Sequence, residues 1–181
     1  QNQSRNLQTS CSFSRFELFQ IRRNFLNQTI TFMDKLEINC AMQIQKPIHE
    51  VFDAIIIPEK MTNYFISQST GIMETGKNLI WKFPEFDFEC PVKVEKIEKD
   101  KYISFYWENS GVDLLVEITL SEKENNTTLV SISEKSMENN EAGLKWLSGN
   151  SFGWSNFLSC LKAYLEYNIN LRKGAFDFMK K

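Results

Sequence analysis

Histidine is nearly absent from this sequence. The 181 residues include a single histidine, His49, beside 21 lysines and arginines and 23 acidic residues. Histidine is the usual general base near neutral pH and a common protein ligand of metals. The sequence therefore argues against most histidine-based catalysis before any motif is considered.

Long apolar runs are also missing. The mean hydropathy is −0.36, and charged residues interrupt each apolar stretch before the roughly 18 residues that a membrane-spanning helix needs. The net charge of −2 argues against nucleic acid or an anionic membrane as the main partner, because phosphate binding needs clustered cations. With 42% apolar residues, the chain has the composition of one soluble domain with a proper core.

Cysteines at metal-binding spacing are absent too. Cys11, Cys40, Cys90 and Cys160 stand singly, without a C-x-x-C pair or a neighbouring histidine. We therefore expect no metal, no cofactor, and reduced thiols that pack as small apolar side chains. Such thiols are typical of the cytoplasm, which is the expected location.

Charge usage changes sharply at Met33. Residues 1–32 hold four of the five arginines, no lysine and one acid, which gives +3, whereas residues 33–181 carry −5. We expect a domain over 33–175, a tail over 176–181, and an N-terminal extension over 1–32 outside the fold. That extension is a targeting peptide or, as we favour, sequence upstream of the true start or added for expression.

Alternating apolar and polar residues predict an antiparallel sheet. A period of two marks a strand over 36–44. Two short helices should follow, beginning at Pro47 and Pro58, because proline is favoured in the first helical turn. Further strands are expected over 67–74, 78–83, 86–94, 102–107, 114–120 and 130–132.

A long helix is expected over roughly 140–168. It would carry one apolar stripe, with Lys162 and Glu166 facing water. Gly149 and Gly153 lie in that stripe and cost about 1 kcal/mol each relative to alanine, so we expect them where the helix backbone approaches a sheet closely. This element order is typical of an α+β helix-grip fold, in which a curved antiparallel sheet of about six to seven strands surrounds a long C-terminal helix.

Two stretches of the chain resemble a known family. The segments IQKPI at 44–48, VFDA at 51–54 and PE at 58–59 are shared across the START-like (SRPBCC) superfamily, and GWSNFLSCLKAYLE at 153–166 is more specific. Over 36–165 the chain resembles the AHSA family, homologues of an activator of heat-shock chaperone ATPase, and departs from it in the charged stretch 136–141. The resemblance implies a helix-grip fold, an apolar cavity for lipids, sterols or polyketide-like ligands, and binding to a heat-shock chaperone.

Aromatic residues dominate the positions expected to face the terminal helix. Such a wall suits a flat or hydrophobic ligand, because small-molecule pockets are mostly apolar with few polar groups. The same side chains could instead fill the core and leave no cavity, and both alternatives stay open. The expected ligand-binding residues are Trp81, Phe83, Phe105, Trp107, Val116, Ile118, Glu134, Trp146, Trp154 and Phe157.

Few residues are suited to chemistry. Glu134 continues the apolar row of Val130 and Ile132, so it either points inward as a potential acid or base or is solvated, as carboxylates at strand ends more often are. His49 is a base by type, but its spacing places it on the wet side of its helix. The sequence contains no nucleophile elbow, phosphate loop or metal motif, and we assign no catalytic residue.

Three functions from different classes remain. The favoured one is binding of a small hydrophobic molecule, lipid-like or aromatic, between the sheet and the C-terminal helix. The first alternative is an interaction module for a heat-shock chaperone. The second is a cyclase- or hydrolase-type enzyme, which the scarcity of histidine makes least favoured. The sequence does not specify the ligand or the oligomeric state.

Overall fold

The computed structural model describes residues 35–109 and 111–180, which form one antiparallel sheet and a long helix. The predicted N-terminal extension and Cys11 lie outside the described residues. The helices are α2 (Ile48–Ile56), α3 (Pro58–Met61) and α4 (Glu141–Tyr167), with short 3-10 turns at Glu124–Asn126 and Asp177–Met179. The strands are β1 (Lys35–Ile44), β2 (Gln68–Ser69), β3 (Asn78–Lys82), β4 (Glu89–Glu98), β5 (Tyr102–Asn109), β6 (Val112–Lys123) and β7 (Thr127–Glu138).

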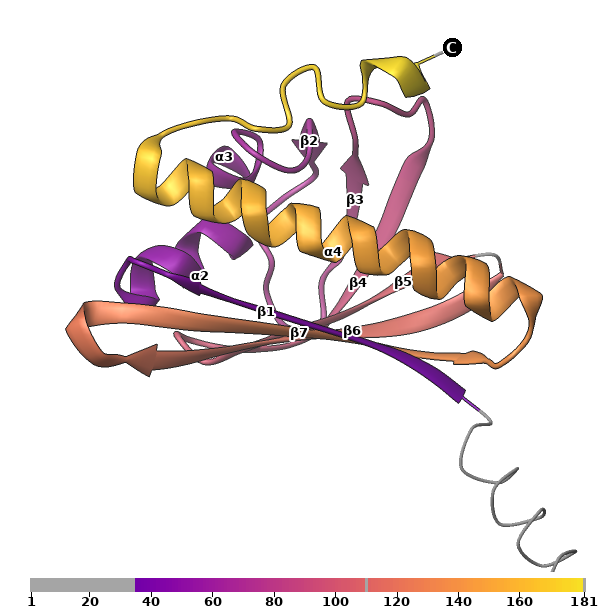
Figure 1. Cartoon of the computed structure of the whole chain (residues 1–181), viewed down its shortest axis with the longest axis horizontal. Helices are drawn as coiled ribbons and strands as arrows, with labels where there is room; N and C mark the ends of the chain where they lie inside the picture. Colours follow the sequence, from indigo (N-terminus) through magenta and orange to yellow (C-terminus); the bar gives the residue numbers. More distant parts are fainter. Residues whose placement is uncertain (1–34, 110, 181) are drawn as a thin grey trace, which may run out of the picture. The chain divides into compact units, whose positions relative to one another are not determined.

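The sheet follows the order β1-β7-β6-β5-β4-β3-β2, and each neighbouring pair is antiparallel. Helix α4 runs along one face of the sheet, and α2 and α3 lie on the same side (Figure 1). This arrangement confirms the predicted helix-grip fold, including the two short helices after the first strand.

The core lies between the inner face of the sheet and α4. Buried residues alternate with more exposed ones along β6 and β7, as in β6, where Leu114, Val116 and Ile118 are buried. Aromatic rings fill the space beneath the helix: the rings of Trp81 and Phe105 lie 5.3 Å apart, centroid to centroid. The alternation of apolar and polar residues in the sequence therefore correctly predicts which side chains face the core.

Asparagine residues cap both ends of α4. The Asn140 side chain accepts a hydrogen bond from the Gly143 N–H at 3.0 Å, and Asn168 ends the helix in the left-handed conformation. The prediction that Glu166 faces water is wrong, because its side chain is almost fully buried. It accepts hydrogen bonds from the Gln45 N–H at 2.7 Å and the Lys162 ammonium at 2.6 Å, and so ties α4 to the end of β1.

The helix glycines have a different role from the predicted one. The tight approach occurs at Gly143, where a Cβ would lie 2.0 Å from the backbone oxygen of Glu138. A Cβ at Gly149 or Gly153 would meet nothing within 4 Å. The prediction of close packing at these two glycines is therefore wrong, because each faces open space.

Two predicted strands are shorter than expected. The strand expected over 67–74 is reduced to Gln68–Ser69, because the Ser69 hydroxyl bonds to the backbone of Gly71 and starts a turn. The strand expected over 86–94 begins at Glu89, opposite the last residue of β3. Phe86 and Phe88 therefore belong to the hairpin between β3 and β4, where their rings stack with centroids 5.1 Å apart.

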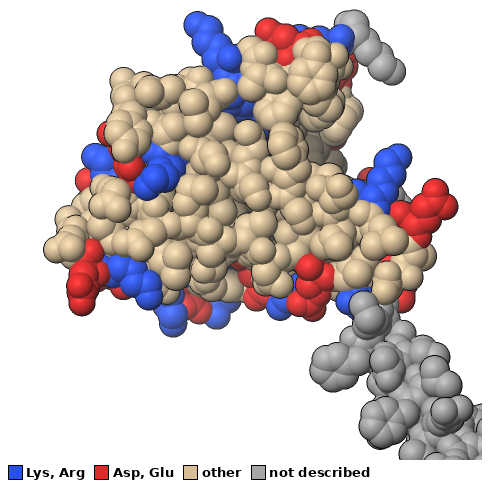
Figure 2. Space-filling view, viewed as in Figure 1, with Lys and Arg blue, Asp and Glu red and all other residues tan. Residues whose placement is uncertain are grey.

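The segment after α4 folds back over the short helices and the β3–β4 hairpin (Figure 1). Arg172 in this segment forms an ion pair with Glu85, with 2.9 Å between Nη2 and Oε2. Figure 2 shows charged side chains gathered below the sheet and at its ends, with a mostly uncharged surface across the helix side. None of the described helices is long and apolar enough to cross a membrane.

We expect two glycine substitutions in α4 to have opposite effects on stability. Gly143→Ala should lower the free energy of unfolding by about 2 kcal/mol, because the new methyl group collides with the backbone at Glu138. Gly149→Ala should raise it by about 0.5–1 kcal/mol, because alanine is the better helix former and meets no neighbour. Urea denaturation measures both, and equal effects at the two positions would contradict this assignment.

Candidate functional site

A cavity of about 360 Å³ lies between α4, the β3–β4 hairpin and the end of β5. Six of its thirteen lining residues are aromatic, and the walls combine residues from the sheet, the helix and the segment after the helix. They consist of Phe65, Phe83, Phe86, Phe88, Cys90, Trp107, Glu108, Asn109, Gly149, Asn150, Gly153, Trp154 and Arg172. Since Gly149 and Gly153 carry no side chain on this wall, the helix contributes space at two successive turns.

A fully buried carboxylate is held at the inner side of this site. Glu134 is 0% exposed and lies in the middle of β7, paired with Ile38 of β1 and Val116 of β6. Of the two alternatives for Glu134, the structure therefore shows the inward one. The side chain points at α4 because it continues the inward row of β7.

Three indole groups and one amide donate hydrogen bonds to Glu134. Its Oε1 accepts from Trp107 Nε1 at 2.8 Å and from Trp146 Nε1 at 3.3 Å. Its Oε2 accepts from Trp154 Nε1 at 2.7 Å. The Asn150 Nδ2 spans both oxygens at 3.0 and 3.2 Å. The carboxylate therefore joins β7, β5 and two turns of α4.

No cation takes part in this cluster. Among the described residues, no lysine or arginine forms an ion pair with Glu134. Burying a carboxylate is costly unless hydrogen bonds replace its hydration, and here neutral donors alone supply them. Because an indole N–H can only donate, Trp107, Trp146 and Trp154 are matched to an acceptor at this position.

The cluster and the cavity share three residues. These are Trp107, Asn150 and Trp154, which donate hydrogen bonds to Glu134 and also line the cavity. The ring centroids of the two tryptophans lie 5.2 Å apart. Hydrogen bonding at one edge of each indole fixes the ring that forms the cavity wall. The part of the cavity wall made by Trp107, Asn150 and Trp154 is therefore held in place before any ligand enters.

Arg172 covers another part of the cavity. Its guanidinium lies 5.6 Å from the Phe65 centroid and 5.7 Å from that of Phe83, and it also stacks on Phe176 at 4.9 Å. The ion pair with Glu85, whose side chain is 3% exposed, holds it there. The aromatic wall thus already contacts one organic cation.

The cavity thiol is a weak nucleophile. Burial, and secondarily the charge of Glu108, raises the pKa of the Cys90 thiol from 9.0 to about 11. Thiol chemistry requires the thiolate, which is scarce near neutral pH at such a pKa. Cys40, Cys90 and Cys160 are all free thiols, as predicted.

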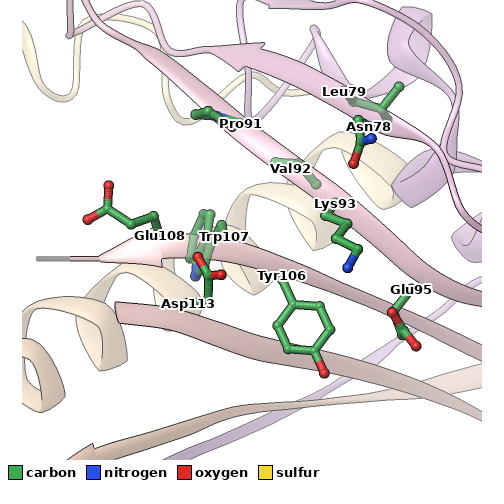
Figure 3. Close-up of a pocket in the computed structure, with 10 residues that line it drawn as sticks. All are labelled: Asn78, Leu79, Pro91, Val92, Lys93, Glu95, Tyr106, Trp107, Glu108 and Asp113. Atoms are coloured by element: carbon green, nitrogen blue, oxygen red, sulfur yellow. The ribbon is translucent and has the colours of Figure 1, made fainter. Parts of the chain in front are cut away.

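A larger hollow, of about 570 Å³, lies on the outer face of the sheet. Figure 3 shows Lys93 and Tyr106 side by side on neighbouring strands, and α4 lies on the far side of the sheet from them. The ammonium of Lys93 lies 5.9 Å from the Tyr106 centroid. This hollow is lined mainly by polar and charged side chains and lacks buried polar groups directed into it, so the inner cavity is the better candidate.

The structure divides the residues predicted from the sequence into two groups. Phe83, Trp107 and Trp154 line the cavity, and Glu134 and Trp146 support it. The others lie in the packed core: Trp81, Phe105, Val116, Ile118 and Phe157. Core filling and a cavity, treated as alternatives in the sequence, therefore coexist. His49 is exposed on α2, outside the cavity lining.

Sequence reasoning missed several cavity residues, notably Asn150 and Arg172. Asn150 stands four residues from both Trp146 and Trp154, so a polar side chain interrupting an apolar helical stripe was the available signal. Nothing local marked Arg172, because it reaches the cavity through contacts with Phe65 and Phe83, far away in the sequence.

Residues 45–166 match the family model described as "Activator of Hsp90 ATPase homolog 1-like protein". The chain belongs to this family. The family resemblance read from the sequence is thereby confirmed. No curated protein matches the chain in sequence.

Solved structures share the fold. Protein SSP2350 from Staphylococcus saprophyticus is 31% identical, with 76% of this chain and 96% of that chain covered and a TM-score of 0.67. The Aha1 dimer from Colwellia psychrerythraea is 18% identical, with 73% and 97% covered and a TM-score of 0.63. CalU16 from Micromonospora echinospora is 18% identical, with 78% and 81% covered and a TM-score of 0.60. The last two show the fold alone.

We expect the stability of the domain to depend on the acceptor at position 134. Glu134→Leu should lower the free energy of unfolding by about 3–5 kcal/mol, because it leaves the buried indole N–H groups of Trp146 and Trp154 without an acceptor and removes the bonds of Trp107 and Asn150 as well. Glu134→Gln should lower the free energy of unfolding by less, because glutamine keeps one of the two acceptor oxygens. Chemical denaturation measures both variants, and a Glu134→Leu protein as stable as the parent would contradict the described network.

Proposed function

We propose that this protein binds a small, mostly apolar molecule in the cavity between the sheet and α4. The observation that carries the proposal is that Gly149 and Gly153 open space in the middle of a long helix, opposite aromatic side chains. Helix-interior glycine destabilises by about 1 kcal/mol, so filling either position would be the more stable solution. A binding site explains why the space is left empty.

The size and chemistry of the cavity support a small ligand. Its volume of about 360 Å³ falls within the roughly 300–1,000 Å³ of typical small-molecule sites. Six aromatic residues line it, and polar groups such as Asn150 are placed among them. This combination favours a ligand with a flat or aliphatic body and a single polar group.

The rigidity of the wall supports binding as well. Trp107 and Trp154 are held by bonds of 2.8 and 2.7 Å to one buried carboxylate. A ligand entering such a site need not order these side chains, which lowers the entropic cost of association. The weak nucleophilicity of Cys90 and the fully bonded state of Glu134 favour binding over cyclase or hydrolase chemistry.

A neutral fluorescent probe tests the proposal. N-phenyl-1-naphthylamine should bind saturably at one site, with increased emission. Gly153→Leu should weaken the binding at least about tenfold, because the leucine side chain occupies the cavity. The matched control is Ser148→Leu, which places the same side chain at an exposed helix position outside the lining. Equal binding by the Gly153→Leu variant and the parent would refute the proposed site.

Family membership favours a second candidate function, binding to a heat-shock chaperone. If the domain acts in this way, adding it to an Hsp90-type chaperone should raise the ATP hydrolysis rate in a dose-dependent manner. Ser148→Leu and Gly153→Leu separate the two functions, because only the second blocks the cavity. An unchanged ATPase rate at saturating protein would reject this candidate and leave ligand binding intact.

A further inference from the structure

We infer that the cavity selects ligands carrying a protonated amine on an apolar body. The inference rests on the proposed function and specifies its ligand class. It follows from the orientation of Asn150, the charge balance around the cavity and the aromatic faces that line it.

Glu134 determines which atom Asn150 offers to a ligand. The indole partners of Glu134 can only donate, so the carboxylate accepts at both oxygens, and the Asn150 amide must present its Nδ2 to it. The carbonyl Oδ1 of Asn150 accepts no hydrogen bond from any described residue, although Asn150 lines the cavity. The cavity therefore offers a hydrogen-bond acceptor at this point, and the complementary ligand group is a donor.

The charges around the cavity are unbalanced toward the negative. Arg172 is the cation in the lining, and its ion pair with Glu85 at 2.9 Å neutralises it. Glu134 behind Asn150 is paired with neutral donors only, and Glu108 adds a second negative charge at the rim. A ligand with one positive charge would compensate this excess, and the buried Glu134 carboxylate behind Asn150 is screened less by water than a surface charge.

The aromatic wall is suited to a cation. The rings of Phe65 and Phe83 already contact the guanidinium of Arg172. Trp107 and Trp154 donate to a carboxylate, which polarises each indole and makes its face more attractive to a positive charge. An ammonium group beside Asn150 would thus combine a hydrogen bond, a charge interaction and cation–π contacts.

One group in the cavity lining, the Arg172 guanidinium, favours a negatively charged ligand instead. Arg172 Nε is buried and has no hydrogen-bond partner among the described residues, so an acidic ligand could pair with it. An amine is nevertheless the better match to the cavity, because Glu85 already neutralises Arg172 and Glu134 would repel an anion. Acidic ligands are therefore included in the test as the competing outcome.

The test compares ligands that share one apolar body. 2-Naphthylmethylamine, 2-naphthalenemethanol and 2-naphthylacetate carry a cation, a neutral donor and an anion at pH 7, and displacement of bound N-phenyl-1-naphthylamine measures the affinity of each. We expect the amine to bind at least about tenfold more tightly than the carboxylate, with the alcohol between them. Carboxylate binding as tight as amine binding would overturn the inference and leave the proposed function standing.

Two variants identify the residues responsible. Glu134→Gln should reduce the preference for amine over carboxylate to less than about threefold, whereas Glu122→Gln, the same change at an exposed position, should leave it unchanged. Asn150→Leu removes the acceptor but keeps the indole bonds of Glu134, and it should also reduce the preference.

Probe binding distinguishes the possible failures. Variants that bind the neutral probe as the parent does have kept the cavity, so an unchanged amine preference in both would overturn the assigned roles of Glu134 and Asn150. If the parent binds neither the probe nor any naphthyl compound, the proposed function itself fails.

Discussion

The burial of the Glu134 carboxylate is the constraint on which this site depends. A carboxylate in the middle of a sheet, with no paired cation among the described residues, is tolerated because Trp107, Trp146, Trp154 and Asn150 direct four donors at it. Those donors come from β5 and from α4, so satisfying one carboxylate also fixes the position of the helix over the sheet. The electrostatic requirement of a single side chain thereby sets the geometry of a large part of the inner face.

The same requirement links the fold to a function. A packed helix–sheet interface would fill the space at Gly149 and Gly153, yet the cluster around Glu134 holds the neighbouring indoles at fixed positions and leaves that space open. Stability and an open cavity are therefore compatible, because polar bonds replace part of the packing lost there. The ordered indoles also present rigid faces, which small-molecule binding favours.

Much of the fold could be predicted from the sequence, because local periodicity reports on which face of an element is buried. The inward row of Val130 and Ile132 follows from alternation, which for Glu134 left open an inward or a solvated side chain, and the long helix follows from its apolar stripe. The cavity could not be predicted in this way. A glycine in a helix fits a close contact with the sheet as well as it fits an open space, and only the structure shows that Gly149 and Gly153 face open space. Asn150 and Arg172 were missed because their roles arise from contacts between distant segments.

One buried carboxylate holds three of the four tryptophans. Trp81 provides an internal control, because its Nε1 is buried and donates to no described group. The most direct measurement is the ¹H–¹⁵N spectrum of the indole N–H groups in the parent and in Glu134→Gln. We expect the signals of Trp107, Trp146 and Trp154 to move, because Glu134 accepts from all three, and the Trp81 signal to stay in place. Three indole signals unchanged by the substitution would contradict this role of Glu134.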